Sequence, residues 1–171
     1  MARDHLRAAG REPEWTAFQG ALYGPGMTHA QPFEGAIDTM GQLARQGHQL
    51  MIVSHRSRRP YAGPPHDLHA AARDWVERRL RSAGLFLNDE ADTAENGAVN
   101  FLETREAKVA RLAELGCQVF VDDLPEVLEA PGFPEGTAGV LFAPGGEGSR
   151  AQGQHRIAAW RELPGLLAQL P

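Results

Sequence analysis

Residues 104–123, TREAKVARLAELGCQVFVDD, decide the fold class of this chain. Thr104 is a favoured helix N-cap and Gly116 a favoured residue just after a helix, so the stretch predicts a helix over 105–115. The mostly apolar residues 118–121 follow at once, and such a run is typical of a strand buried on both faces. A helix that leads directly into a buried strand is the repeating unit of an α/β protein.

Helices and strands alternate along the rest of the chain as well. The other predicted elements are helices over 2–9, 13–23, 34–46 and 67–83, strands over 49–53, 98–102 and 138–142, a short helix ending near 129 and a last helix over 157–170. Strands separated by helices imply a parallel sheet wound by right-handed crossovers. Ligands of such sheets bind beyond the carboxyl ends of the strands, so residues at those ends are the first candidates for a site.

Length and composition exclude several classes of protein. The chain has 171 residues, 42% of them apolar, which suits one domain with one hydrophobic core. No apolar run approaches the roughly 20 residues that cross a bilayer, and residues 1–15 lack the apolar stretch of a signal peptide. We therefore expect a cytoplasmic protein without a membrane partner. The net charge of −5 argues against a nucleic-acid partner, and the single cysteine, Cys117, excludes an intramolecular disulfide.

Lys108 is unusual because it is the single lysine among 17 basic residues, the other 16 being arginine. In a chain also rich in glycine and proline, this ratio indicates a coding bias that would replace any lysine needed only for its charge. Arginine cannot imitate a compact ammonium on a flexible stem. A cation in the first turns of a helix also opposes the macrodipole, so local stability does not explain Lys108. A phosphoryl group or a carboxylate facing Lys108 would explain the presence of a lysine at this position.

Ser54, His55 and Arg56 follow the predicted strand over 49–53. A hydroxyl followed by exposed backbone N–H groups can hold a phosphate oxygen, and a serine here is also typical of a plain turn. His55 and the arginines after it are candidates for gathering a phosphorylated substrate. An arginine cluster in a loop is usually a solvated surface, so both interpretations remain open for these residues.

Asp122 and Asp123 end the strand over 118–121. Repulsion and desolvation would raise at least one of the two pKa values unless a cation is present. Mg²⁺ suits the arrangement, since it commonly takes one or two carboxylates and keeps several waters. Asp123 is alternatively an N-cap of the next short helix, and both roles are compatible if Asp122 binds the metal.

Ser54, Lys108 and the pair Asp122–Asp123, in this order, resemble the second, third and fourth motifs of the haloacid dehalogenase (HAD) superfamily of phosphohydrolases. The strings IVSHRSRRPYAGPPHDLHAAA and TREAKVARLAELGCQVFVDDLPEVL look like one bacterial HAD-like hydrolase subfamily. The resemblance covers roughly residues 15–145. It implies a three-layer, Rossmann-like core with a parallel sheet.

The resemblance also implies a role for each matching residue. Ser54 would hydrogen-bond the transferring phosphoryl group, with His55 and Arg56 beside it on the substrate. Lys108 would stabilise negative charge on the reacting oxygens, and Asp122 with Asp123 would position Mg²⁺.

The first motif of the family, an apolar strand ending in Asp-x-Asp, has no counterpart in this sequence. Its first aspartate is the nucleophile and its second the general acid/base. Asp4, Asp89 and Asp92 follow no apolar strand. The missing strand is the central one of the family's sheet, so its two neighbours would either face unpaired backbone groups or pair directly with each other. We expect either a loss of the motif or a start codon assigned too far downstream.

The domain organisation expected from these motifs is a single domain over 1–171. Its core would span 33–171, and the segment 1–32, with Trp15 and Phe18, would form a helical cap or a helix pair that covers the core. In family terms we expect a Mg²⁺-dependent phosphomonoester hydrolase acting on a small phosphorylated metabolite, inactive in this chain because the nucleophile is absent. The alternative is a non-catalytic module that keeps the scaffold for binding a ligand or a protein.

Overall fold

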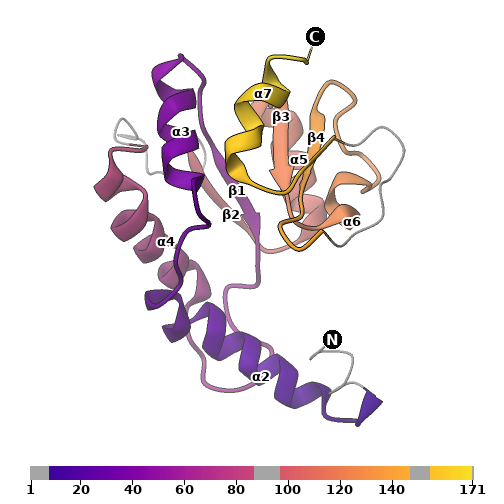
Figure 1. The fold of residues 1–171 in the computed structure, drawn as a ribbon. Coiled ribbons are helices and arrows are strands. Elements are labelled where there is room, and N and C mark those ends of the chain that lie inside the picture. The colour runs from indigo at the N-terminus through magenta and orange to yellow at the C-terminus, as the bar shows by residue number, and fades with distance from the viewer. Residues whose placement is uncertain (1–7, 87–96, 147–154, 171) are drawn as a thin grey trace. The chain divides into compact units, whose positions relative to one another are not determined.

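The computed structural model describes residues 8–86, 97–146 and 155–170 (Figure 1). The contacts within the chain divide it into two compact units. Unit 1 comprises residues 1–31 and 56–84, and unit 2 comprises 32–55 and 85–171. The helical segment expected over 1–32 thus falls almost entirely in unit 1, where residues 56–84 join it. No helix of the described ranges combines the length and the apolar character needed to span a bilayer.

Unit 1 is helical. Its elements are α2 (Glu12–Tyr23), the 3₁₀ helix η1 (Pro25–Thr28), α4 (Leu68–Arg79) and the 3₁₀ helix η2 (Arg81–Ala83). Asp67 caps α4 as its sequence predicts, because its side chain accepts a hydrogen bond from the N–H of Ala70 at 2.9 Å. The indole N–H of Trp75 donates to the carbonyl of Ala30 at 3.0 Å, which ties α4 to the segment after η1. Residue 20 must be glycine, because a Cβ there would lie 2.7 Å from Pro60.

Unit 2 contains every strand that the structure describes, together with four α-helices. Its elements are α3 (Ala36–Arg45), β1 (Ile52–His55), β2 (Val99–Leu102), α5 (Arg105–Leu115), β3 (Val119–Asp122), α6 (Pro125–Leu128), β4 (Ala138–Phe142), β5 (His155–Ile157), the 3₁₀ helix η3 (Trp160–Glu162) and α7 (Leu163–Leu167). The predicted helix over 105–115 is confirmed at both ends. Thr104 accepts a hydrogen bond from Ala107 N–H at 3.1 Å, and Gly116 takes the left-handed conformation.

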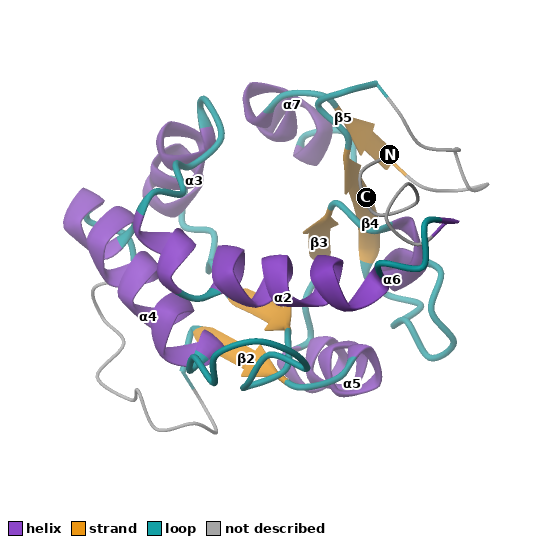
Figure 2. Cartoon of the chain, turned by 90° about the horizontal axis from the view of Figure 1, so that it is seen from below, coloured by secondary structure: helices purple, strands orange, loops and turns teal. Residues whose placement is uncertain are grey.

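The strands of unit 2 form two parallel sheets (Figure 2). One has the order β1-β2, with Val53 opposite Asn100, and the other has the order β3-β4-β5, with Val121 opposite Val140. Parallel pairing was predicted and is confirmed, but in two separate sheets rather than one. Within the described residues β1 and β3 do not pair directly, so that alternative is wrong here.

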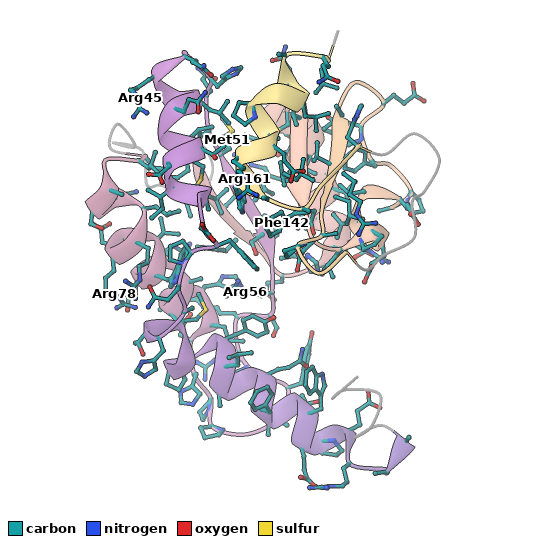
Figure 3. The ribbon with its side chains drawn as sticks, viewed as in Figure 1. Arg45, Met51, Arg56, Arg78, Phe142 and Arg161 are labelled. Atoms are coloured by element: carbon teal, nitrogen blue, oxygen red, sulfur yellow. The ribbon has the colours of Figure 1, made fainter. Side chains whose placement is uncertain are left out.

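The main apolar cluster of unit 2 lies between its helices and the three-stranded sheet. Leu43 of α3 packs there with Val140 and Phe142 of β4, Ile157 of β5 and Leu163 of α7. Phe142, labelled in Figure 3, also meets Phe33 edge to face, with ring centroids 4.8 Å apart. A second cluster, with Leu128 and Leu141, involves α6 and β4.

Two predicted elements differ from the structure. The helix over 157–170 is wrong, since β5, η3 and the short α7 occupy that region. Burial of Ile157 against β4 takes that residue into a strand, and Pro164 lies in the first turn of α7, where proline is tolerated, so this helix begins only at Leu163. The strand predicted over 49–53 begins three residues later and ends two residues later, at 52–55. The predicted helix over 2–9 falls largely outside the described residues.

Candidate functional site

The centre of the candidate site is a buried ion pair between Lys108 and Asp122. The ammonium of Lys108 donates a hydrogen bond to Oδ2 of Asp122. The two side chains are only 7% and 5% exposed. Of the two partners that the sequence analysis left open for Lys108, a phosphoryl group or a carboxylate, the structure shows a carboxylate, that of Asp122, 14 residues further along the chain.

Local structure explains how the two side chains meet. Lys108 lies in the first turns of α5, and its backbone N–H bonds to the carbonyl of Thr104, the capping residue. Asp122 is the last residue of β3, the strand that follows α5. Phe120 lies two positions earlier, and residues two apart in a strand share a face. The Lys108 nitrogen accordingly lies 5.1 Å from the Phe120 ring centroid as well, within the range of a cation–π contact.

The second oxygen of the Asp122 carboxylate fixes the start of α6. Oδ1 of Asp122 accepts a hydrogen bond from the backbone N–H of Leu124 at 3.0 Å. The N-cap of α6 is Leu124, so the prediction that Asp123 caps this helix is wrong. The side chain of Asp122 binds the backbone N–H of this N-cap residue instead, while the side chain of Asp123 is exposed. Desolvation, followed by the charge of Asp122, raises the pKa of Asp123, and Lys108 opposes the shift.

Ser54 and His55 end β1, the strand that contacts α5. Ser54 is half-buried and lies inside the strand opposite Phe101, which excludes the plain turn. Burial lowers the pKa of His55, the positive charge of Lys108 lowers it further, and Asp122 opposes the change. These interactions place the carboxyl end of β1 within electrostatic reach of the ion pair. The Nδ1 atom of His55 is buried and has no hydrogen-bond partner among the described residues.

Arg56 belongs to unit 1 although it follows His55 directly. Its guanidinium carbon lies 5.3 Å from the ring centroid of Tyr23 in α2, and Figure 3 labels the side chain. Burial lowers the pKa of Arg56. Its backbone carbonyl lies 2.9 Å from Nε2 of His69. Arg56 therefore packs as part of the helical unit, and its role toward a substrate stays a prediction.

The residues proposed for Mg²⁺ can be tested against the chemistry of the ion. Both oxygens of Asp122 already accept one hydrogen bond from the protein, which leaves each of them one further lone pair. Asp123 offers a carboxylate whose pKa is raised first by desolvation and then by the charge of Asp122, and a cation would offset both effects by stabilising the ionised form. A hydrated ion held mainly by Asp123 fits this donor set. No cluster of three or more His, Cys, Asp or Glu side chains suited to a metal occurs in the described ranges.

A supporting network behind the site escaped the sequence analysis. Oδ1 of the buried Asn100 in β2 accepts a hydrogen bond from Nε of Arg111 in α5 at 2.9 Å. The Asn100 amide donates to the carbonyl of Gly97 at 2.8 Å. These bonds hold α5, and with it Lys108, against the first sheet. A polar residue within a predicted apolar strand was the one signal that could have indicated the network.

Comparisons of the chain with models of protein families, with curated proteins and with solved structures found no match.

Proposed function

We propose that the chain carries the phosphoryl-binding part of a HAD-type phosphatase site and does not hydrolyse phosphomonoesters by itself. The observation that carries the proposal is the buried Lys108–Asp122 pair at the end of β3, with the carboxyl end of β1 in electrostatic reach. An ammonium that is desolvated and already oriented interacts more strongly with an arriving oxyanion than a solvated one does. Lys108, which supplies this ammonium, is the single lysine of the sequence.

Each residue of the site would have a distinct part in binding. The Ser54 hydroxyl, which has no hydrogen-bond partner in the described ranges, would donate to a phosphoryl oxygen. Lys108 would share its remaining donors between that group and Asp122. Asp123, supported by Asp122, would hold a hydrated Mg²⁺, which would neutralise phosphoryl charge. A small phosphorylated metabolite remains the proposed ligand class.

The missing nucleophile limits this proposal to binding. The sequence contains no Asp-x-Asp after an apolar strand, so no carboxylate is placed to accept a phosphoryl group. The same observation favours the second candidate function, a non-catalytic module that binds a phosphorylated ligand on the same residues.

Calorimetry and a phosphatase assay test the proposal together. Inorganic phosphate with Mg²⁺ should bind, and the chain should release no phosphate from p-nitrophenyl phosphate above background. Ser54→Ala should weaken binding about ten-fold through loss of one hydrogen bond to a charged group. Ser82→Ala, which changes an exposed serine in unit 1, is the matched control. Equal binding by Ser54→Ala, or robust turnover, would contradict the proposal.

A further inference from the structure

Three aromatic side chains from distant parts of the sequence meet at the carboxyl edge of the three-stranded sheet. Phe142, labelled in Figure 3, is the last residue of β4. Its ring centroid lies 4.8 Å from that of Phe33 and 5.6 Å from that of Trp160. Trp160 follows β5, Phe33 lies in the turn before α3, and all three residues belong to unit 2. Phe33, Phe142 and Trp160 are called the aromatic cluster below.

Phe33 is the open member of the aromatic cluster. It is 58% exposed, whereas Phe142 is buried and contacts it edge to face. The backbone around Phe33 is held by a turn, because its carbonyl accepts a hydrogen bond from Ala36 N–H at 3.0 Å. Gly35 completes the turn in the left-handed conformation, with φ 75°, which other residues rarely adopt. An aromatic ring that is held in place and mostly exposed can stack against a planar group of a ligand.

The register of the sheet relates the aromatic cluster to the proposed phosphoryl site. Asp122, the last residue of β3, is opposite Leu141, the residue before Phe142 in β4. Neighbouring strands lie about 4.8 Å apart and a strand rises about 3.3 Å per residue, so the Cα atoms of Asp122 and Phe142 lie about 6 Å apart. The buried pair of Lys108 and Asp122 and the aromatic cluster therefore share one edge of the sheet, the edge at which parallel sheets bind their ligands.

The ion pair and the aromatic cluster lie on opposite faces of the sheet at that edge. On one face, Leu141 packs with Phe120, whose ring also contacts the ammonium of Lys108. On the other face, Phe142 packs with Leu43 of α3. A ligand that contacts both groups must cross the edge, so it needs a spacer between its anionic end and the end that meets the aromatic cluster.

Location separates Phe33 from other exposed aromatic side chains of the chain. Single exposed apolar residues are common and need no function. Phe18 is 54% exposed in α2, and Tyr61 is exposed in the loop before α4, but both belong to the helical unit 1. Phe33, in contrast, lies at the sheet edge that carries the buried ion pair.

We propose that the phosphorylated ligand of this chain is a nucleoside 5′-monophosphate, whose base stacks on Phe33 while its phosphate contacts Ser54 and Lys108. This inference rests on the proposed phosphoryl site and names its ligand class. The phosphate, the sugar and the planar base match, in this order, an anion site, an edge to cross and an exposed aromatic ring. A sugar phosphate lacks the ring, and an aryl phosphate lacks the spacer.

Calorimetric titration with four ligands in the presence of Mg²⁺ tests the ligand class. Adenosine 5′-monophosphate should bind about ten-fold more tightly than ribose 5-phosphate, which lacks the base. Phenyl phosphate has a ring without a spacer and should bind no more tightly than ribose 5-phosphate. Inorganic phosphate reports on the phosphoryl site alone. Equal affinities for adenosine 5′-monophosphate and ribose 5-phosphate would overturn the inference, and so would a similar gain in affinity for phenyl phosphate.

Substitutions of Phe33 test where the base binds. Phe33→Leu removes the ring and should bring the ratio of the affinities for adenosine 5′-monophosphate and ribose 5-phosphate close to one. Phe33→Tyr keeps a ring and should keep the ratio of the parent chain. Phe18→Leu makes the same change at a side chain of similar exposure in unit 1 and is the matched control. A ratio in Phe33→Leu equal to that of the parent chain would overturn stacking on Phe33.

The indole N–H signals of the parent chain give a test that depends on no variant of Phe33. The chain contains Trp15, Trp75 and Trp160, of which the first two lie in unit 1 and serve as internal controls. In a heteronuclear correlation NMR spectrum, adenosine 5′-monophosphate should shift the Trp160 signal through the ring current of the base, and ribose 5-phosphate should shift it much less. The spectrum of Trp160→Phe assigns the signal. Shifts of equal size with both ligands would contradict the inference.

Failure of this inference and failure of the proposed function give different results. Binding of inorganic phosphate and ribose 5-phosphate, with no gain for adenosine 5′-monophosphate, would leave the phosphoryl site standing and overturn the base site. Absence of binding by both inorganic phosphate and adenosine 5′-monophosphate would overturn the phosphoryl site and, with it, this inference.

Discussion

At the scale of single residues, the charge of Lys108 and that of Asp122 depend on each other for their burial. Removing one partner leaves the other charged and desolvated, which typically costs about 3–5 kcal/mol. We expect Lys108→Met to lower the free energy of unfolding by about 3 kcal/mol, and Asp122→Asn by a similar amount. The side chains are 7% and 5% exposed, so solvent screening is small.

A double-mutant cycle in urea measures this dependence. The variant with both substitutions should lose clearly less stability than the sum of the two single losses, because no uncompensated charge remains. Arg11 and Glu14, an exposed pair in unit 1, provide the control, and their cycle should give a much smaller coupling, because solvent screens exposed charges. Additive losses for Lys108 and Asp122 would show that the two charges are not coupled.

His55 makes stability depend on pH in a predictable direction. Its pKa is lowered in the folded chain by burial and by Lys108. As pH falls below about 6.5, the unfolded chain binds a proton that the folded chain resists, so the contribution of His55 is present at neutral pH and lost on acidification. The free energy of unfolding of the parent chain should therefore fall more steeply between pH 7 and pH 5.5 than that of His55→Asn. Parallel curves would contradict the lowered pKa.

Asp123 makes stability depend on pH in the opposite direction. Its pKa is raised by desolvation and by Asp122, so ionisation above its unfolded pKa of about 3.9 destabilises the folded chain. Asp123→Asn should raise the free energy of unfolding at pH 7 by a few tenths of a kcal/mol, a small effect because the side chain is exposed. The difference should vanish near pH 3, where the parent carboxylate is protonated. Thermal unfolding at the two pH values measures it, with Glu126→Gln as the control.

At the scale of elements, the N-cap of α5 also positions the site, because Lys108 lies one turn after Thr104. Thr104→Ala removes the acceptor for Ala107 N–H and should cost about 1 kcal/mol of stability. Thr104→Ser keeps the hydroxyl and should cost only a few tenths of a kcal/mol of stability. Chemical denaturation compares the two variants, and equal losses would mean that the hydroxyl contributes nothing to the cap.

Elements with strong local signals were predictable from the sequence, and those fixed by distant contacts were not. Thr104 and Gly116 bound α5, and the apolar run over 138–142 marked β4, because caps and buried strands are local properties. The helical spacing over 157–170 was misleading, since the pairing of β5 with β4 depends on a strand that lies outside this segment.

The candidate site likewise has features that the sequence predicted and features that it did not. The sequence indicated that Lys108 needed a negative partner and that Asp122 ended a strand, so the pair itself followed from topology. The Asn100–Arg111 network and the Phe120 ring were missed because each depends on packing between two elements. The capping role of Asp123 was wrong because the turn after β3 uses the side chain of Asp122 instead.

At the scale of the whole molecule, division into two compact units predicts that the chain loses structure in parts. Leu43 is 4% exposed and packs only with residues of unit 2 in the main apolar cluster. Leu43→Ala should cost about 2–5 kcal/mol through lost burial and the cavity left behind. Because local opening follows clusters of mutual contacts, we expect hydrogen exchange to accelerate in β4, β5 and α7 while the amides of α2 and α4 keep their rates. Equal acceleration throughout the chain would mean that both units unfold in one cooperative step, and Ala44→Gly, on the exposed side of α3, controls for a change in the helix itself.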